Sequence, residues 1–408
     1  MREGRSASAE SANHKRKRGV LCHALWLFLT VCCFLSSGQA WAVPRPEDWT
    51  WNVCVLPPEG GWATEQGESI RATLSWLQKR VSDSADGVRG HDLLFVFLPP
   101  ADESTILKLP LPIDAKTVAV MSFASDITNR ALMERLRADK EDLPLLLAGG
   151  EDAPFGSRDR SVFALDLFRD YRASAFAAYA AEVLLPETRL GLIGSRFTVD
   201  QEREARICLA LLSDAGLMPL PFWVDASASD SFQFVAQEVQ SYGEGVLIAF
   251  AGNMAGKELW RSIRNSELPW QLWQCGRPDD SFLSFPGMLF ADQNLLLEDL
   301  GGFEGLKRDL WGGWAVKMRN KVAAARAYAL GFWLCRALEA MPGTSERLDR
   351  AALLTSLGSV RDIPFGEQTL SIDPATRRPR SRKVRMLEVR DRKFVVRAAI
   401  NVEGLRSH

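Results

Sequence analysis

The stretch Val118–Thr128, VAVMSFASDIT, joins a continuous apolar run to the start of a helical pattern. An unbroken apolar run is typical of a strand that is buried on both faces of a parallel sheet. Ser125 stands at the junction, where its hydroxyl can accept a hydrogen bond from the first turn of a helix over 126–137. A buried strand followed at once by a helix is the repeating unit of an α/β fold, which this stretch therefore predicts.

The same order of strand and helix extends to both sides of this stretch and restarts in the middle of the chain. The first series has expected strands at 51–56, 92–98, 117–121 and 143–148, with helices at 65–79 and 126–137. The second has strands at 189–194, 219–224, 246–250 and 270–274, with helices at 171–184, 201–215, 232–241 and 256–264. Two such series predict two doubly wound lobes, each with a parallel sheet covered by helices on both faces.

The last ninety or so residues follow a different pattern. A long helix is expected over 321–340 and a short one over 350–357. The segment 368–372 and the segment 384–396, in which apolar and polar residues alternate, then predict strands of β-hairpins. We expect these strands to be added to the edge of one lobe.

The first 42 residues have the order of parts of a secretory signal peptide. A basic cluster at 15–18 precedes the apolar run Val20–Leu35, and Ala40-Trp41-Ala42 provides a small-x-small cleavage site. The run of about 16 residues is shorter than the roughly 20 needed to span a bilayer, which favours cleavage after Ala42 over a permanent anchor. The sequence therefore predicts a mature protein, residues 43–408, in the periplasm.

The mature chain is mildly acidic. The chain has 50 basic and 51 acidic residues, of which six basic and two acidic lie in the signal segment, so the mature formal charge is 44 − 49 = −5. This balance excludes the broad basic surface of a nucleic-acid-binding protein. One basic stretch, Arg377–Lys383, could attract an anionic surface, and a solvated hairpin loop is the simpler interpretation.

Four cysteines remain after cleavage: Cys54, Cys208, Cys275 and Cys335. An oxidising periplasm would permit a disulfide between them. Cys54 lies in a strand-like run, however, and Cys208 and Cys335 lie on apolar helical faces. These positions favour buried free thiols, because free cysteine packs as a small hydrophobic residue.

The motifs of enzymes are missing from the sequence. The mature chain has only two histidines, His91 and His408, no G-x-S-x-G elbow and no zinc-type spacing. The stretch 251–258 resembles a phosphate-binding loop, but Glu258 replaces the hydroxyl residue that holds magnesium. We therefore expect no catalysis, no cofactor and no metal.

The order of parts resembles the branched-chain amino acid-binding family of type I periplasmic binding proteins, over nearly all of the mature chain. The likeness is found in four segments: Gly60-Gly61 with Gln66-Gly67, Val118–Thr128, Leu165–Ala180 (LDLFRDYRASAFAAYA), and Lys321–Ala340 with Phe365-Gly366 and Ile372-Asp373. The resemblance implies two lobes, each built from discontinuous chain, joined by three crossovers. By this analogy lobe one is 43–168 plus 291–345, and lobe two is 169–290 plus 346–402.

A ligand of such a protein is expected between the lobes, at the carboxyl ends of the strands. In the family, hydroxyls that match Ser125 and Thr128 hold an amino acid's carboxylate; a plain helix cap is the alternative, and Asp126 would repel an anion. Gly149 permits close approach of the backbone. Glu151 could pair with a ligand ammonium or be a solvated loop charge. Trp62 could stack on a ligand or cover the core.

In the second lobe the resemblance points to four positions that follow strands. Phe197 stands where the family often has an aromatic residue, and Asn253 follows the strand 246–250. Arg277 and Asp279 follow the strand 270–274, close to the place of the family's acidic group for a ligand ammonium. If Arg277 faces the ligand, the ligand is an acid other than an amino acid.

These observations predict a monomeric solute-binding protein that captures an amino acid or small carboxylate for an ABC importer. Its expected partners are the small molecule and the permease subunits in the inner membrane. Two alternatives remain open: a ligand-sensing partner of a membrane receptor, and a degenerate accessory protein that binds no small molecule.

Overall fold

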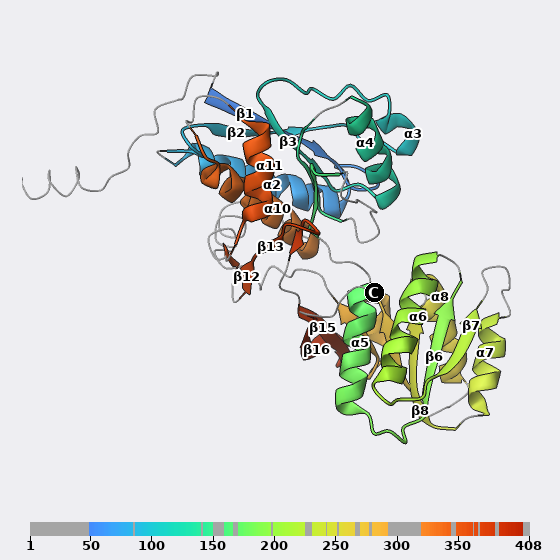
Figure 1. The fold of residues 1–408 in the computed structure, drawn as a ribbon. Helices are drawn as coiled ribbons and strands as arrows, with labels where there is room; N and C mark the ends of the chain where they lie inside the picture. Colours follow the sequence, from blue (N-terminus) through green and yellow to red (C-terminus); the bar gives the residue numbers. More distant parts are fainter. Residues whose placement is uncertain are drawn as a thin grey trace, which may run out of the picture.

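The computed structural model describes most of the chain beyond the expected signal segment. The described residues are 49–84, 86–139, 142–149, 159–165, 170–196, 199–224, 231–241, 243–250, 253–265, 270–276, 280–292, 320–343, 348–361, 363–365, 368–379 and 383–402. They form two α/β lobes, and the two-lobed fold predicted from the sequence is confirmed (Figure 1).

The sheet of lobe one has five parallel strands within the described residues, in the order β2-β1-β3-β4-β5. The strands are β1 (Thr50–Leu56), β2 (Asp92–Phe97), β3 (Thr117–Ser122), β4 (Leu145–Leu147) and β5 (Val162–Ala164). The helices between them are α2 (Glu65–Ser82), α3 (Glu103–Ile106) and α4 (Asp126–Ala138). The chain thus passes outward from β1 to β2 and then returns to the other side of β1 for β3.

Both faces of this sheet are buried, which explains its apolar strands. Val53 and Val55 of β1 point into a core formed with α2, whereas Cys54 and Leu56 point into a second core formed with α3 and α4. The first core also contains α10 (Lys321–Ala340) and α11 (Arg350–Ser359). Gly331 lets α10 approach α2 closely, because a Cβ there would lie 2.3 Å from Leu77 Cδ2.

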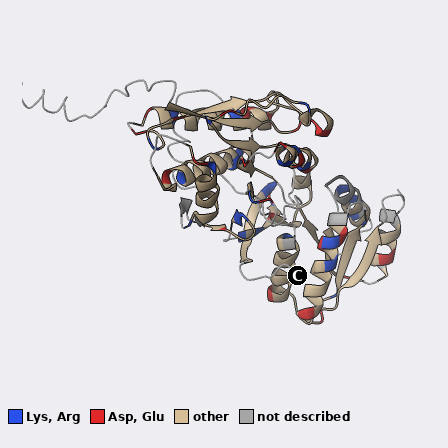
Figure 2. Ribbon diagram, turned by 45° about the horizontal axis from the view of Figure 1, so that its top comes forward, with Lys and Arg blue, Asp and Glu red and all other residues tan. Residues whose placement is uncertain are grey.

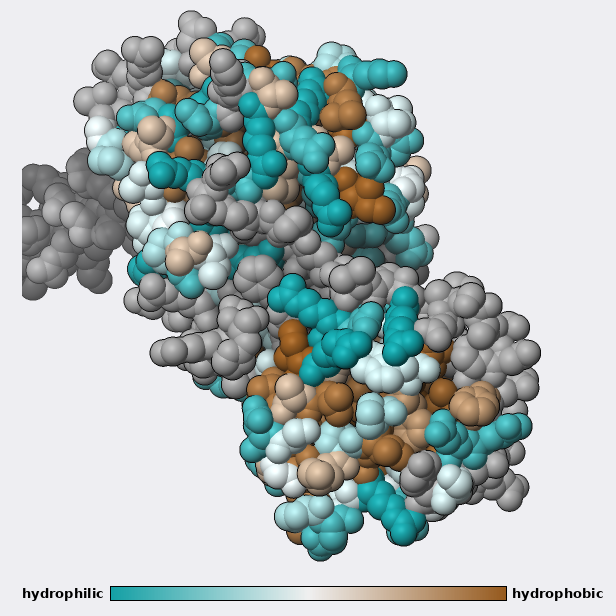
Figure 3. All heavy atoms as spheres, turned by 45° about the vertical axis from the view of Figure 1, so that its right-hand side comes forward, coloured by the Kyte–Doolittle hydropathy of each residue, from teal (hydrophilic) through white to brown (hydrophobic). Residues whose placement is uncertain are grey.

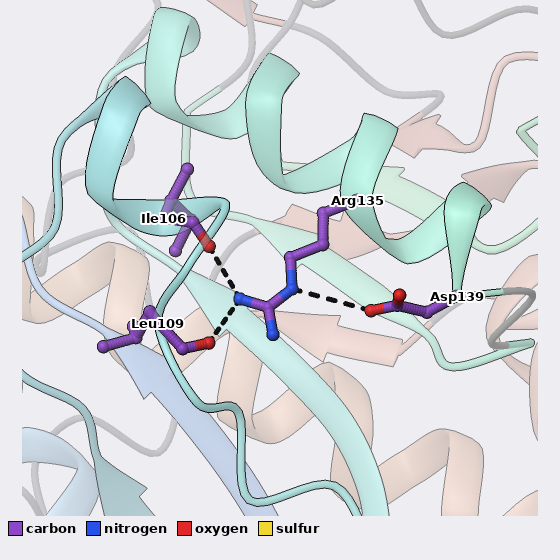
Figure 4. Close-up of polar contacts among 4 residues, drawn as sticks. All are labelled: Ile106, Leu109, Arg135 and Asp139. Carbon is purple, nitrogen blue, oxygen red and sulfur yellow. Dashed lines mark hydrogen bonds and ion pairs between the residues drawn. The ribbon is translucent and has the colours of Figure 1, made fainter.

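Arg135 fastens the other face of the sheet (Figure 4). It projects from α4, and its Nη1 donates hydrogen bonds to the carbonyl oxygens of Ile106, the last residue of the short helix α3, and Leu109, in the loop that follows. Its Nε lies 3.5 Å from Asp139 Oδ2. These carbonyl groups have no partner within α3, and the charged guanidinium of Arg135 supplies one. The loop is thereby held against α4.

The sheet of lobe two has the order β16-β15-β10-β9-β8-β6-β7. Its parallel strands are β6 (Leu190–Ser195), β7 (Leu220–Val224), β8 (Gly245–Phe250), β9 (Trp270–Cys275) and β10 (Leu289–Asp292). The covering segments are α5 (Asp170–Val183), α6 (Val199–Asp214), α7 (Ser231–Gln240), α8 (Asn253–Asn265) and the 3-10 helix η2 (Asp280–Ser284). In Figure 2 the charged residues of both lobes lie chiefly on helices, as expected for sheets with two buried faces.

Two cores again sandwich this sheet. One packs β8 residues such as Ile248 against α5 and α6, and the other packs Leu247 and Ala249 against α7 and α8. Between α5 and α6 lies a buried ion pair, in which Arg172 Nη2 donates to Glu204 Oε1 at 2.8 Å.

The C-terminal hairpin extends the sheet of lobe two, which agrees with the strands expected over 384–396 at the edge of one lobe. The strand expected over 368–372 is divided between two short strands and joins neither large sheet. β15 (Lys383–Arg390) pairs antiparallel with β10, and β16 (Lys393–Asn401) pairs antiparallel with β15. The intervening chain forms two short two-stranded units: β11 (Ile363–Phe365) with β12 (Gln368–Leu370), and β13 (Ile372–Asp373) with β14 (Arg378–Pro379).

The packing of three segments bears on the boundaries drawn by analogy. The expected boundary at 345/346 separates α10 from α11, yet Leu353 and Leu357 of α11 lie in the same core as α10. Ile372 also lies in that core. The expected boundary at 290/291 falls within β10, all of which pairs in the sheet of lobe two.

All four cysteines of the described chain are buried and free, as the sequence favoured. Burial raises the pKa of the Cys54 thiol to about 11, with a smaller contribution from Asp114. Burial likewise raises the pKa of Cys335 to about 12 and raises that of Cys208. In the described part of the chain, no helix has the length and apolar composition of a membrane span.

Candidate functional site

The carboxyl ends of β1, β3 and β4 form one edge of the lobe-one sheet, because these strands are parallel neighbours. Trp62 follows β1, Ser125 and Thr128 follow β3, and Gly149 follows β4. The structure therefore brings these four predicted residues to one edge. The edge includes the point between β1 and β3 where the strand order reverses, which is where open α/β sheets bind ligands.

The loop after β1 is built by glycines and a helix cap. Gly60 and Gly61 have φ of +79° and +80°, which glycine adopts without strain. Thr64 caps α2: its hydroxyl donates to Gly61 O at 2.8 Å and accepts from Gly67 N at 3.1 Å. A Cβ at Gly67 would lie 2.3 Å from Gly61 O, so the loop packs directly on the helix.

Trp62 is held in this loop by polar and aromatic contacts. Its Nε1–H donates to Leu98 O at 2.6 Å, and its ring meets Phe97 edge to face at 5.0 Å between centroids. The Arg71 guanidinium lies 5.2 Å from the Trp62 centroid. Trp62 thus covers the end of the first core and is half-buried there.

Ser125 caps α4, as predicted. Its backbone is extended (φ −63°, ψ 161°), and its Oγ accepts from Thr128 N at 3.4 Å. The two hydroxyl oxygens lie 3.1 Å apart. Thr128 is buried and Ser125 half-buried. The structure therefore places a hydroxyl pair at the positive end of a helix dipole, an environment that suits an anion.

Two buried residues beneath this pair were missed from the sequence. Ser122, the last residue of β3, donates from Oγ to Asn129 Oδ1 at 2.5 Å and accepts from Ala124 N at 3.3 Å. Asn129 Nδ2 donates to Ala124 O at 3.1 Å. Both side chains are fully buried. They fix the loop that presents Ser125, and their one signal in the sequence is a polar residue at the end of an apolar strand followed by an asparagine in the next helix.

Gly149 and Ile127 complete what is described of this edge. Gly149 is half-buried and stands two residues beyond β4, whose pairing with β3 continues through Ala148 N to Ser122 O at 2.9 Å. Ile127, in the first turn of α4, is 60% exposed. An apolar side chain therefore stands at the surface beside the hydroxyl pair.

In lobe two, β6, β8 and β9 are neighbours, so the residues that follow them share one edge. Asn253 begins α8 directly after β8. Its side chain, and all of Glu151, Phe197, Arg277 and Asp279, lie outside the described residues.

Arg196 is a charged residue at this edge that sequence reasoning missed. It follows β6 directly and is exposed, with its guanidinium 5.4 Å from the centroid of Trp223. Its backbone N–H donates to Val224 O at 2.9 Å. Its only signal in the sequence is a cation directly after an apolar strand.

Among the residues that the structure describes, no group of three or more His, Cys, Asp or Glu could hold a metal ion. No protein-family model matches the chain, and no curated protein matches it in sequence.

Solved structures, in contrast, match most of the chain. A leucine-binding protein from Thermotoga maritima has a TM-score of 0.64 at 13% identity, covering 86% of this chain and 99% of its own. A solute-binding protein of an ABC transporter from R. palustris, in complex with benzoate, has a TM-score of 0.63 at 13% identity, covering 87% and 98%. A fatty acid ABC transporter substrate-binding protein from Thermomonospora curvata has 0.61 at 17%, covering 88% and 93%.

These proteins share the two-lobed architecture over nearly their whole length, at identities too low to identify a common ligand. The two doubly wound sheets, their strand order and this coverage together show that the chain has the type I periplasmic binding protein fold.

Proposed function

We propose that the mature chain is a periplasmic solute-binding protein that captures a small molecule between its lobes and delivers it to an ABC importer. The observation that carries this proposal is the Ser125–Thr128 hydroxyl pair at the switch point of a type I binding-protein fold. Two of the similar structures are solute-binding proteins of ABC transporters, which supports the same role. Export by a cleaved signal peptide is part of this proposal.

The proposal includes a division into lobes that follows the sheets and cores. Lobe one comprises 49–165 and 320–379, and lobe two comprises 170–292 and 383–402. The chain then crosses between lobes three times. Ligand capture by closure of one lobe on the other is the usual motion of such proteins.

The ligand class that fits best is a small carboxylate with an apolar part. The Ser125–Thr128 hydroxyls and the helix end would hold the carboxylate, and the exposed side chain of Ile127 would contact the apolar part. Arg196 adds positive charge from lobe two, whereas Asp126 opposes an anion. The similar structures include a leucine-binding protein, a complex with benzoate and a fatty acid transporter's substrate-binding protein, and all three compounds are carboxylates with apolar groups.

The remaining predicted residues have supporting roles in this proposal. Trp62 and Gly149 would line the ligand from lobe one, and Phe197 and Asn253 from lobe two. Glu151 or Asp279 would hold an ammonium if the ligand is an amino acid. Arg277 would join Arg196 if the ligand lacks one.

The test is thermal melting of residues 43–408 with leucine, benzoate and octanoate. Each carboxylate is compared with its amide (leucinamide, benzamide and octanamide), which lacks the negative charge. A ligand at 100 times its Kd stabilises the folded state by about 2.7 kcal/mol. We expect a clear shift with at least one carboxylate and a much smaller one with its amide. Ser125→Ala should weaken binding by about tenfold and cost about 1 kcal/mol of stability through the lost cap.

Asp349→Ala is the matched control. Asp349 caps α11 in the same way, with Oδ1 accepting from Ala352 N at 3.0 Å, but α11 begins near Asp114 on the opposite edge of the sheet. It should lose similar stability and bind the ligand unchanged. If no compound stabilises the well-folded protein, or if both variants bind equally well, the proposal is wrong and the accessory role becomes the better explanation.

A further inference from the structure

The two large sheets have four outer edges within the described residues, and three of these edges are blocked. In β2, Phe95 N–H donates to the Gln78 side chain at 3.1 Å. In β5, Ala164 N–H donates to Arg377 O at 3.2 Å. The edge strand β7 contains Pro221, which has no N–H to offer. Each device prevents pairing with another chain, a recurring need of exposed sheet edges.

The fourth edge, β16, contains no proline, and its pairing with β15 is continuous apart from one register shift at Arg397, opposite Met386 and Leu387. It spans nine residues and no described strand lies beyond it. Val395 and Val396 are 41% and 50% exposed. Over lobe two more widely, Figure 3 shows apolar atoms at the surface among polar ones. A long edge strand with exposed β-branched residues is suited to accept another strand.

The charge of this edge indicates what kind of strand it would accept. The hairpin 383–401 has six basic and two acidic residues, a net charge of 6 − 2 = +4, in a mature chain of net charge −5. β16 itself, KFVVRAAIN, contains Lys393 and Arg397 and no acid. Glu388 of β15 is shared between Arg390 at 3.1 Å and Arg397 at 3.8 Å, so it does not neutralise the edge.

We propose that β16 is a docking edge for an extended acidic segment of a partner protein, which adds to the lobe-two sheet as an eighth strand. Main-chain hydrogen bonds would supply affinity, and acidic side chains beside Lys393 and Arg397 would supply selectivity. A second copy of this chain fits less well, because two β16 strands would bring four cations and no acid together.

The test uses residues 43–408 and two labelled peptides of about seven residues, one alternating glutamate with valine and the other alternating lysine with valine. Binding is measured by fluorescence anisotropy at about 50 mM salt, where charge pairing is least screened. We expect the glutamate peptide to bind at least about tenfold more tightly than the lysine peptide. It should also slow amide hydrogen exchange in β16 by at least about tenfold, because the new strand protects the outward N–H groups.

Charge reversal on β16 tests selectivity. Lys393→Glu with Arg397→Glu should reverse the preference, so that the lysine peptide binds more tightly. The matched control, Lys79→Glu with Lys108→Glu, makes the same charge change at exposed positions of lobe one and should leave the preference unchanged. The exchange measurement on the unaltered chain keeps the test valid if the reversed variant does not fold.

Three outcomes would overturn the proposal. The first is equal binding of the two peptides. The second is binding of the glutamate peptide without slower exchange in β16. The third is self-association of the chain that protects β16 without any peptide, which would make a second copy the occupant.

Discussion

The Arg172–Glu204 pair shows how single buried residues join the helices of lobe two. The two side chains lie between α5 and α6 with exposed fractions of 10% and 5%. Two charges taken out of water gain little net stability from each other, yet either one left alone costs much more. The pair therefore fixes the relative position of the helices more than it stabilises the fold.

We predict that Glu204→Leu destabilises lobe two by about 3–5 kcal/mol, since it leaves the buried Arg172 charge without its carboxylate. The double variant Arg172→Met with Glu204→Leu should lie within about 1 kcal/mol of the natural chain. Urea unfolding followed by tryptophan fluorescence would measure the stability of both variants. Trp273 reports on this core, since its ring centroid lies 5.3 Å from that of Tyr179 in α5. A single variant as stable as the double one would contradict this.

At the scale of elements, the β15–β16 turn contains backbone strain that another residue type would relieve. Arg390 pairs with Lys393, so the turn has two residues, Asp391 and Arg392, with φ of 50° and 56°. This is the left-handed geometry in which hairpins favour Asn-Gly. Arginine is disfavoured there because its Cβ crowds the backbone.

Arg392→Gly should therefore raise the free energy of unfolding by about 0.5–1 kcal/mol. Arg392→Ala removes the same charge but keeps a Cβ, so it should not stabilise the protein. Denaturant unfolding of the three proteins separates the effects of backbone and charge. Equal stabilisation by alanine and glycine would attribute the effect to charge and contradict the prediction.

Long elements were predictable because a pattern repeats along them, and short ones were not. The helix predicted over 321–340 agrees with α10, whose twenty residues are mostly apolar and mostly buried. The four-residue strand β10 was missed, since its strand conformation depends on β9 and β15 on either side. The β15–β16 turn was missed because Asp391-Arg392 does not resemble Asn-Gly.

The candidate site was predictable to the same degree. Ser125 was predicted as a cap because capping is local, between residues three apart. Ser122 and Asn129 were missed because their hydrogen bond depends on how α4 folds back over β3. That Trp62, Ser125 and Gly149 share an edge agrees with the parallel direction of their strands, which the βαβ rhythm predicts, whereas the order of the strands was not predicted.

At the scale of the whole molecule, the same fold is kept by chains with 13–17% identity. Such tolerance is expected when alternating buried strands and amphipathic helices specify the architecture. The buried thiols belong to this apolar interior: Cys54 and Cys335 lie in the cores of lobe one, and Cys208 and Cys275 in a core of lobe two. Because burial keeps a thiol neutral in each lobe, the free energy of unfolding should fall at alkaline pH.

Cys335 allows this linkage to be tested. Burial, with a smaller contribution from Glu339 and opposed by Arg336, raises its pKa from 9.0 to about 12. The folded state therefore holds the proton more tightly, so the stability is fully present below pH 9 and is lost as pH rises towards 12. Between pH 7.5 and pH 10 the natural chain should lose about 1.4 kcal/mol more than Cys335→Ala, as measured by urea unfolding at each pH. Other titrating groups cancel in that difference, so equal losses in the two proteins would show that the Cys335 thiol ionises as readily in the folded lobe as in the unfolded chain.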